Sequence, residues 1–340
     1  MKIVYTGPMR LGSLTESRRV SLIELGHEVV TVDQVPYLDK RSYWSRKMHH
    51  HLTFGPGVRA YNRELLRAVQ GVKPDLVYID QGQYLWPKTV AAMKPASKRI
   101  VHYTSEHFGF RPYLYRHFRK TISLYDAHVH SFQFSRQWLL EQGAKRVIKA
   151  EFGYDPALHR PVSLSNEGRA KVESDVIFIG HYEPETARMI QALSSSGVSV
   201  QIHGPGWRRN ARRICKDLQI RPAVYGEEYV RLLAAAKICL CFLSKWANNT
   251  THSASRTFEI PAIGSFLLAE RTPDHLSYYV EGKEAEFFSS AEELIEKTKY
   301  YLANEARRKQ IAAAGQRRCL SSGYTQRDRL KQILDGIEHG

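Results

Sequence analysis

The first 33 residues, MKIVYTGPMRLGSLTESRRVSLIELGHEVVTVD, decide the expected fold. Residues 2–5 predict a short buried strand, residues 6–13 predict a loop rich in turn formers, and residues 17–25 have the spacing of a helix that ends at Gly26. A second strand follows at residues 27–33. Because two strands joined through a helix form a right-handed parallel βαβ unit, this stretch predicts an open parallel sheet.

The same alternation continues along the chain, with one interruption by a polar stretch at residues 153–174. Before the interruption, strands are predicted at 74–79, 99–103, 126–130 and 146–148. After it, they are predicted at 175–180, 198–204, 223–226, 238–243 and 265–269. We therefore expect an α/β protein with two doubly wound, Rossmann-like domains at 1–155 and 175–322, a linker at 156–174, and a helical end at 323–340.

The composition is that of a globular protein whose charge is unevenly distributed. A length of 340 residues favours two domains, and 43% hydrophobic with 25% charged residues excludes a disordered chain. The 50 Lys and Arg exceed the 34 Asp and Glu by 16, and up to Ser165 the excess is 25 − 13 = 12. The basic first half indicates an anionic partner, such as nucleic acid, an acidic membrane surface or an acidic substrate, unless the charge serves only solubility.

The cysteines and the hydropathy favour a cytoplasmic location. None of the four cysteines forms a CxxC pair, which is typical of reduced thiols and not of a disulfide framework or a zinc site. The basic start is not followed by the apolar stretch of a signal peptide, and no apolar run approaches the roughly 18 residues of a membrane span. Peripheral contact with the inner face of a membrane stays open.

Ligands of open α/β sheets bind beyond the carboxyl ends of the strands, so the residues that follow each strand are candidates. In the first domain these are Gly12, Ser13, Asp80, Glu106 and His107. In the second domain they are Gly180, His181, His203, Gly204, Gly206, Trp207, Tyr225 and Lys245. We expect the two sets to face each other across an interdomain cleft. The GxGxxG and P-loop patterns are both missing, which disfavours NAD enzymes and P-loop NTPases.

The most specific segment is SASRTFEIPAIG at residues 253–264. Ser253, Ser255 and Thr257 open a short helix, whose N–H groups and dipole favour an anion. Arg256 adds a forked cation suited to phosphate oxygens, and Glu259, one turn later, can accept both hydroxyls of a ribose. The alternative is an ordinary capped helix with a surface Arg–Glu pair.

The run RTFEIPAIGSFLL at 256–268 resembles the signature of the GT-B glycosyltransferases, specifically their spore-maturation CgeB-like or glycosyl transferases group 1 branch. Residues 153–161 and 287–294 are similar to the same branch, and the resemblance covers much of 152–334. It implies a GT-B fold in which the C-terminal domain binds a nucleotide-sugar donor and the N-terminal domain binds the acceptor. It also implies that the helix at the end of the chain crosses back to the first domain.

The resemblance assigns roles on the donor side. Glu259 matches the second glutamate of the EX7E element, which holds the donor ribose, whereas the first glutamate would fall at Thr251, so the chain departs from the full element. Arg256 and the amides near Ser255 would take the diphosphate, with Lys245 as a further phosphate candidate.

Further donor-side roles follow from the same resemblance. Residues 203–207 are similar to the branch's glycine turn, with the indole of Trp207 as a wall of the cleft. Tyr225 stands where GT-B proteins meet the base, and His181 is expected to contact phosphate or acceptor.

The expected chemistry uses no bound metal, because no DxD-type carboxylate pair is present. If the configuration is inverted, the base that deprotonates the acceptor should come from the first domain, and Glu106, His107 and, third, Asp80 are the candidates. Gly12 and Ser13 lie on the acceptor side. The three histidines at 49–51 are adjacent and cannot converge on one ion, which favours a solvated loop.

Aromatic and basic residues interleave at 43–48 and 110–120. Such stretches can lie on anionic lipid headgroups, hold a charged acceptor or stack on nucleic-acid bases, or they can be amphipathic helices whose aromatics are core. No known nucleic-acid module accompanies them, so nucleic acid ranks below a membrane or an acidic glycan.

These observations predict a metal-independent, hexosyltransferase-type enzyme with a UDP-, GDP- or dTDP-sugar as co-substrate and no other cofactor. Its acceptor would belong to a cell-surface polysaccharide, a glycolipid or a protein. The alternatives are a GT-B-fold sugar-nucleotide epimerase and a non-catalytic protein that binds sugar nucleotides or nucleic acid.

Overall fold

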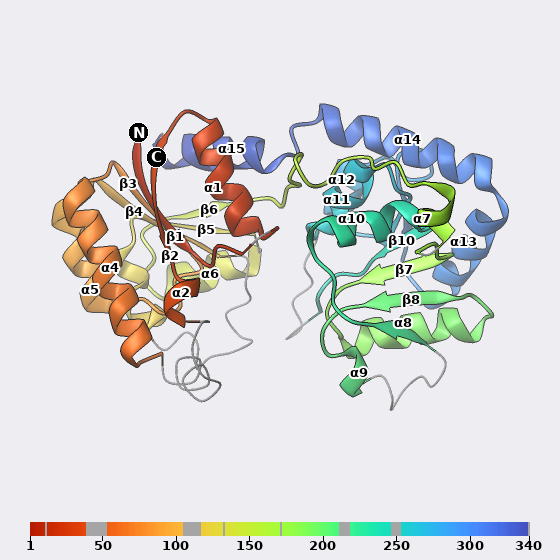
Figure 1. The fold of residues 1–340 in the computed structure, drawn as a ribbon, viewed down its shortest axis with the longest axis horizontal. Helices are drawn as coiled ribbons and strands as arrows, with labels where there is room; N and C mark the ends of the chain where they lie inside the picture. The colour runs from red at the N-terminus through yellow and green to blue at the C-terminus, as the bar shows by residue number, and fades with distance from the viewer. Residues whose placement is uncertain are drawn as a thin grey trace. The chain divides into compact units, whose positions relative to one another are not determined.

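The computed structural model describes residues 1–10, 12–38, 53–104, 117–131, 133–170, 172–210, 218–245 and 253–338. The chain divides into two compact units, drawn in Figure 1. The first unit consists of Met1–Glu151 and Gln326–Gly340, and the second of Phe152–Thr325. Within the described ranges, no helix is both long enough and apolar enough to cross a membrane.

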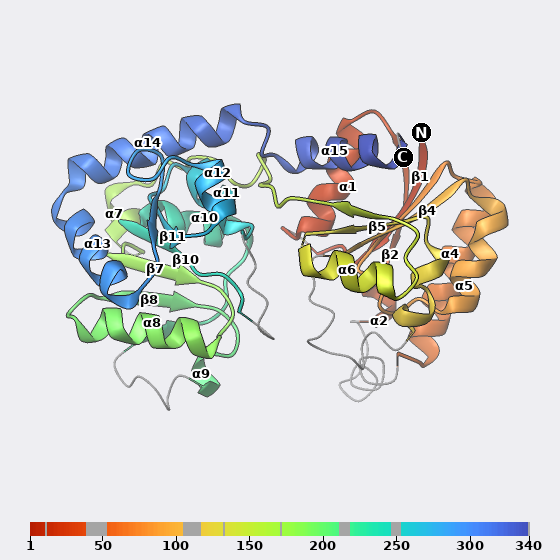
Figure 2. The same cartoon turned by 180° about the vertical axis from the view of Figure 1, so that it is seen from behind.

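The first unit is a six-stranded parallel sheet with helices on both faces. Its strand order is β2-β1-β3-β4-β5-β6, with bounds β1 Lys2–Gly7, β2 Glu28–Asp33, β3 Leu76–Asp80, β4 Arg99–Thr104, β5 Ala127–His130 and β6 Val147–Lys149. One face packs against α4 (Pro56–Val72), α5 (Pro87–Met93) and α6 (Gln133–Glu141), with α2 (Val35–Leu38) beside α4. The other face packs against α1 (Leu14–Glu24) and α15 (Gln326–Glu338), which lie together in Figure 2.

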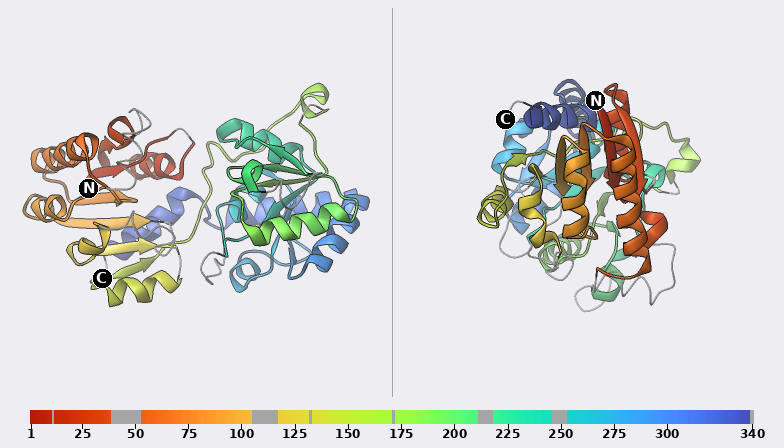
Figure 3. Two further views of the ribbon diagram at one scale, coloured as in Figure 1. Left: turned by 90° about the horizontal axis from the view of Figure 1, so that it is seen from below. Right: turned by 90° about the vertical axis from the view of Figure 1, so that its left-hand side faces the viewer.

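The second unit repeats this architecture with the strand order β12-β11-β10-β7-β8-β9. Its strands are β7 Val176–Ile179, β8 Val200–His203, β9 Gln219–Arg221, β10 Ile238–Cys241, β11 Leu267–Glu270 and β12 Glu286–Phe288. One face carries α8 (Pro184–Ser195), α13 (Ala291–Ala303) and part of α14 (Glu305–Ser321), and the other carries α10 (Gly226–Ala235) and α11 (Arg256–Ile263). Figure 3 shows helices that flank the strands in each unit. The short helices are α7 (Asn166–Ala170), α9 (Trp207–Asn210) and α12 (Pro273–Tyr278).

The expected α/β class with two Rossmann-like domains is confirmed, and one strand prediction is wrong. The strand expected at 223–226 lies instead at Gln219–Arg221, and Gly226 begins α10. Pro222 lacks the N–H that a strand interior needs, and Gly226 has a φ of +60°. The chain therefore leaves the sheet before the predicted residues.

Two buried histidines lie side by side on β4 and β5 of the first unit. His102 and His128 are partners in the parallel register, and their Nδ1 atoms are 3.2 Å apart. Each Nε2 faces a carbonyl oxygen, that of Gln81 at 3.1 Å and that of Ile122 at 2.9 Å, so each Nε2 donates and, in the neutral rings, the two Nδ1 atoms face each other without a proton between them. Burial lowers the pKa of His102 well below its usual value and that of His128 to about 4. Both rings are therefore uncharged at neutral pH.

We predict that the first unit loses stability as the pH falls from 7 towards 4. The unfolded chain binds protons at His128 near pH 6.5, whereas the folded chain does so only near pH 4, so stability is complete above 6.5 and declines below it. The loss from this side chain is on the order of 3 kcal/mol, measured by urea unfolding at several pH values.

His128→Gln is the matched control for this experiment, because its amide can still donate to the Ile122 carbonyl but does not titrate. The variant should show a weaker dependence on pH than the wild type. An identical slope in both proteins would contradict the assignment.

Candidate functional site

The candidate donor residues lie along one edge of the second sheet. The described strands of this unit pair in parallel, so β7, β8, β9, β10 and β11 all end at that edge. The loops after these strands hold the glycine turns, Tyr225, Lys245 and the segment before α11. Residues as far apart in the sequence as Gly180 and Lys245 are thereby brought to the same edge.

Glycines bring the ends of β7 and β8 into close approach. Gly204 has a φ of +146°, and a Cβ on it would lie 1.9 Å from the carbonyl oxygen of Gly180. A Cβ on Gly180 would in turn lie 2.6 Å from the ring of Phe178, and Gly206 has a φ of +86°. These positions therefore need glycine for steric reasons.

Trp207 holds the same turn from inside the unit. Its indole N–H donates to the Gly180 carbonyl at 2.9 Å, and its ring packs edge-on against Phe178 and Tyr182. The side chain is fully buried, so the indole belongs to the core and not to the wall of a cleft. His181, the next residue after Gly180, is exposed.

His203 is fixed on both of its nitrogens. Nδ1 donates to the Pro222 carbonyl at 3.0 Å, and Nε2 accepts from the side-chain amide of Gln201 at 2.7 Å. Burial lowers the pKa of His203, so the ring is neutral at pH 7. Its hydrogen bond to Pro222 connects β8 to the segment after β9. That segment presents Tyr225, which is 73% exposed at the start of α10.

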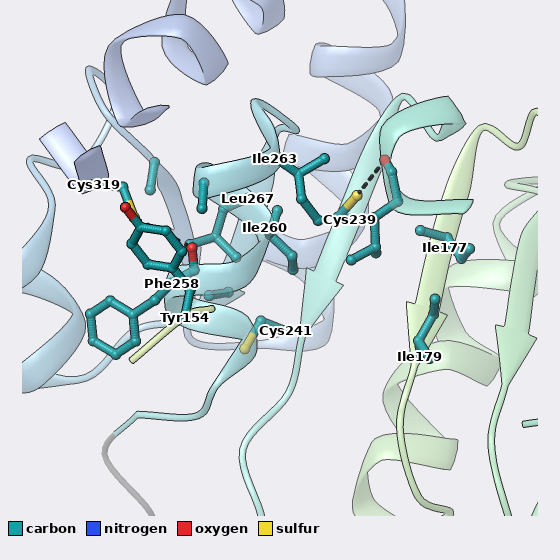
Figure 4. Close-up of a cluster of buried hydrophobic side chains, with 14 of the residues drawn as sticks. Tyr154, Ile177, Ile179, Cys239, Cys241, Phe258, Ile260, Ile263, Leu267 and Cys319 are labelled. Carbon is teal, nitrogen blue, oxygen red and sulfur yellow. Dashed lines mark hydrogen bonds between the residues drawn. The ribbon is translucent and has the colours of Figure 1, made fainter. Parts of the chain in front are cut away.

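A buried hydrogen-bond chain positions the start of α11. The Thr257 hydroxyl accepts from the Ala254 amide at 3.1 Å and donates to His275 Nε2 at 2.8 Å. His275 Nδ1 donates to the Glu270 carbonyl at 2.6 Å, and burial lowers the pKa of this ring. Ser253, just before this chain, is also buried. The hydrogen bonds thus connect the helix start to the end of β11. The apolar side chains of α11, among them Phe258 and Ile260, pack in the core drawn in Figure 4.

The first turn of α11 carries a positive charge on Arg256. Against the opposing effect of burial, the neighbouring Cys241, Tyr229 and Glu259 raise the pKa of its guanidinium. Arg256 Nη2 donates to the Phe242 carbonyl at 3.1 Å, and its guanidinium lies 5.5 Å from the centre of the Phe178 ring. The Nε atom is buried and has no hydrogen-bond partner among the described residues, and no carboxylate there lies at ion-pair distance from the guanidinium. The amides of Ser255 and Arg256 likewise donate to no acceptor in these ranges. This arrangement can bind an anion.

Lys245 differs from Arg256, because its charge is already paired. Its Nζ lies 2.7 Å from Glu270 Oε1, and its backbone amide donates to Glu183 at 3.1 Å. Glu183 follows the predicted strand at 175–180, whereas Glu270 was not predicted to lie at this edge. Within the described part of the chain, no three His, Cys, Asp or Glu side chains come together in a way that could hold a metal ion.

Glu259 is buried and held by two residues that the sequence did not single out. Its Oε2 accepts from the hydroxyl of Tyr229 at 2.6 Å, and its Oε1 lies 3.8 Å from Nε2 of His159. Tyr229 lies on α10, and His159 lies in the 153–161 segment, which was quoted only for its family resemblance. Their convergence depends on tertiary structure.

In the first unit, Asp80 is a buried partner of Arg18. Its Oδ2 accepts from Arg18 at 2.7–2.8 Å and from the hydroxyl of Tyr5 at 2.8 Å, and the side chain is 1% exposed. Gly12 is exposed with a φ of +72°, and Ser13 caps α1 by accepting from the Glu16 amide at 3.2 Å.

Other predicted features fall outside the described residues. They are Glu106, His107, Thr251, the histidines at 49–51, the stretch 43–48 and most of the stretch 110–120. The candidate base on the acceptor side therefore stays a prediction.

We predict that Gly204→Ala destabilises the second unit by about 2 kcal/mol or more, because its Cβ meets the Gly180 carbonyl and its backbone is left-handed. Gly197→Ala is the control, since Gly197 has a φ of +90° but nothing lies within 4 Å of an added Cβ. That variant should show only the backbone cost of about 1–2 kcal/mol. Equal losses in thermal unfolding would show that the close approach is unimportant.

We predict that Arg18→Met destabilises the first unit by about 3–5 kcal/mol, because it leaves the Asp80 carboxylate buried without a cation. The double variant Arg18→Met/Asp80→Asn should recover part of the loss in urea unfolding. Arg67→Met, at an exposed ion pair, is the control and should change little. If Arg18→Met is no worse than this control, the buried pair does not stabilise the fold.

Known proteins resemble this chain in part of its sequence and in its fold. Residues 184–335 match the family model described as Glycosyl transferase-like. A glycosyltransferase from Rickettsia africae superimposes with a TM-score of 0.64 at 12% identity, over 99% of this chain and 97% of that one. Anabaena HepE in complex with UDP and glucose gives 0.64 at 12% identity, over 99% of each chain.

A UDP-N-acetylglucosamine 2-epimerase, described as putative, from Listeria monocytogenes gives a TM-score of 0.56 at 13% identity, over 99% of this chain and 95% of that one. No curated protein sequence is significantly similar to this chain. The chain therefore has the fold of the GT-B glycosyltransferases, and its residues 184–335 are similar to the glycosyl transferase-like family.

Proposed function

We propose that this protein is a glycosyltransferase that moves a sugar from a nucleoside-diphosphate-sugar, bound by the second unit, to an acceptor bound by the first. The observation that carries the proposal is Arg256 at the start of α11: among the described residues its guanidinium has no carboxylate at ion-pair distance, and the amides of Ser255 and Arg256 donate to no acceptor there. These groups fall inside the range that matches the glycosyl transferase-like family.

The residues of this edge suit the departure of a nucleoside diphosphate. Negative charge develops on the diphosphate as the sugar leaves, and Arg256 with the helix amides would stabilise it by electrostatic attraction. Glu259 would accept the ribose hydroxyls, and the exposed ring of Tyr225 would stack on the base. We propose that no bound metal takes part.

We propose a UDP-sugar as the donor and an anionic or membrane-associated molecule as the acceptor. HepE was solved with UDP and with UDP-glucose, which supports a UDP-sugar donor for this chain over GDP- or dTDP-sugars. The excess of 12 positive charges up to Ser165 supports an anionic or membrane-associated acceptor, such as a surface glycan, a glycolipid or a protein. Such an enzyme would work in the cytoplasm with peripheral contact at the membrane.

A sugar-nucleotide epimerase is the second candidate, because the Listeria epimerase shares the fold over nearly the whole chain. The two functions differ in their need for an acceptor. An epimerase changes the sugar of UDP-N-acetylglucosamine without any added partner, whereas a glycosyltransferase releases UDP faster when the acceptor is present. Product analysis by chromatography with and without candidate acceptors separates them.

We predict that Arg256→Gln weakens UDP binding roughly 10- to 100-fold, because a charge-assisted hydrogen bond to phosphate contributes about 1.5–3 kcal/mol. The affinity for uridine, which lacks the phosphates, should stay unchanged. Isothermal titration calorimetry measures both. Arg231→Gln on α10 is the control, since Arg231 is exposed.

If the wild type and Arg256→Gln bind UDP with equal affinity, Arg256 does not bind the diphosphate and the assignment is wrong. If the wild type binds no nucleotide but binds oligonucleotides with a steep dependence on salt, the protein is a nucleic-acid binding protein instead.

A further inference from the structure

The carboxylate of Glu259 is held from two sides within the second unit. The side chain is 8% exposed, and its Oε2 accepts from Tyr229 at 2.6 Å while Oε1 lies 3.8 Å from His159 Nε2. The three residues come from α11, from α10 and from the segment that precedes the second sheet. Tyr229 and His159 also pack edge-on against each other, with ring centres 6.0 Å apart.

The proton of His159 has a defined position. Its Nδ1 accepts from the backbone amide of Asp155 at 3.0 Å, so in the neutral ring the proton is on Nε2, which faces Glu259. The turn around the ring is also fixed, because the His159 amide donates to the Asp155 carbonyl at 2.7 Å and Asp155 Oδ1 accepts from Ala157 at 2.9 Å. His159 is 6% exposed and has little freedom to rotate away.

We infer that Tyr229 and His159 are positioning residues that orient Glu259 for a ribose, and that they thereby select ribonucleoside diphosphates over dTDP-type donors. Each carboxylate oxygen has two acceptor sites, so Oε2 keeps one after it accepts from Tyr229, and Oε1, which His159 Nε2 approaches to 3.8 Å without a hydrogen bond, keeps at least one for a ligand. A carboxylate locked in this way can accept the 2′- and 3′-hydroxyls together. A deoxyribose supplies only one of them.

The inference rests on the proposed function and adds a selection rule to it. A buried site built to accept a hydroxyl discriminates strongly against the analogue that lacks it, because the acceptor is then left unpaired. A carboxylate that is free to rotate loses part of this selectivity, because it can turn to another donor when one hydroxyl of the ligand is missing. The positioning residues should therefore affect the ratio of two affinities and not the affinity for phosphate.

The test compares the dissociation constants of UDP and 2′-deoxy-UDP by calorimetry. The wild type should prefer UDP by roughly 10-fold or more, the equivalent of about 1.4 kcal/mol. Tyr229→Phe and His159→Phe should each reduce this preference several-fold while the affinity for 2′-deoxy-UDP stays within about twofold of the wild type. His159→Phe keeps a ring of similar shape, so the loss would be due to the missing N–H.

Two further variants separate positioning from folding. His159→Gln should restore the preference, because its amide nitrogen takes the place of Nε2 and can still donate towards Glu259. Tyr300→Phe removes a hydroxyl from a tyrosine that is 52% exposed on α13 and should leave both affinities unchanged.

If the wild type binds UDP but Tyr229→Phe and His159→Phe keep the wild-type preference for UDP, the positioning role is overturned and the proposed function is not. Loss of both affinities together in these variants would also overturn the positioning role, since that result indicates a general structural effect. If the wild type binds no UDP, the proposed function itself fails.

Discussion

The parallel direction of the strands in the second unit is the constraint on which the candidate site depends. Because β7, β8 and β10 end at one edge, the Gly180 turn, the Gly204 turn and the Phe242 carbonyl are neighbours there. The Phe242 carbonyl holds the guanidinium of Arg256, and the Gly180 carbonyl holds the indole of Trp207. An antiparallel β8 would start at this edge instead of ending there. The Gly204 turn and Trp207 would then lie away from the Gly180 carbonyl.

Local sequence patterns were enough to predict most of the fold. Parts of the candidate site could not be predicted, because they depend on contacts between residues far apart in the sequence. The apolar runs located most strands because buried parallel strands read as continuous apolar segments. The residues at 223–226 also looked like such a run, but Pro222 ends the strand before them. Arg256 and Glu259 could be picked out by chemistry at a helix start, whereas His159 could not, since 100 residues separate it from Glu259.

Charges in the first unit show why composition is only a guide to binding. Asp80 follows a strand and carries a carboxylate, which made it a candidate base, yet its partner Arg18 lies 62 residues earlier and removes it from solvent. Ten of the 15 histidines lie before Ser165, but His102 and His128 are buried and neutral. These two histidines therefore add nothing at neutral pH to the excess of 12, which counts lysines and arginines against carboxylates.

The distribution of charge along α11 indicates which ligand fits the edge. Arg256 and Glu259 are three residues apart, which is a rise of about 4.5 Å along the helix. A ligand that carries only negative charge would be attracted by Arg256 and repelled by Glu259. Lys245 does not change this balance, because Glu270 pairs with it and Glu183 lies against its backbone. The nucleoside diphosphate that we propose as the ligand has both kinds of group, since its ribose places hydroxyl donors a few ångströms from its anionic phosphates.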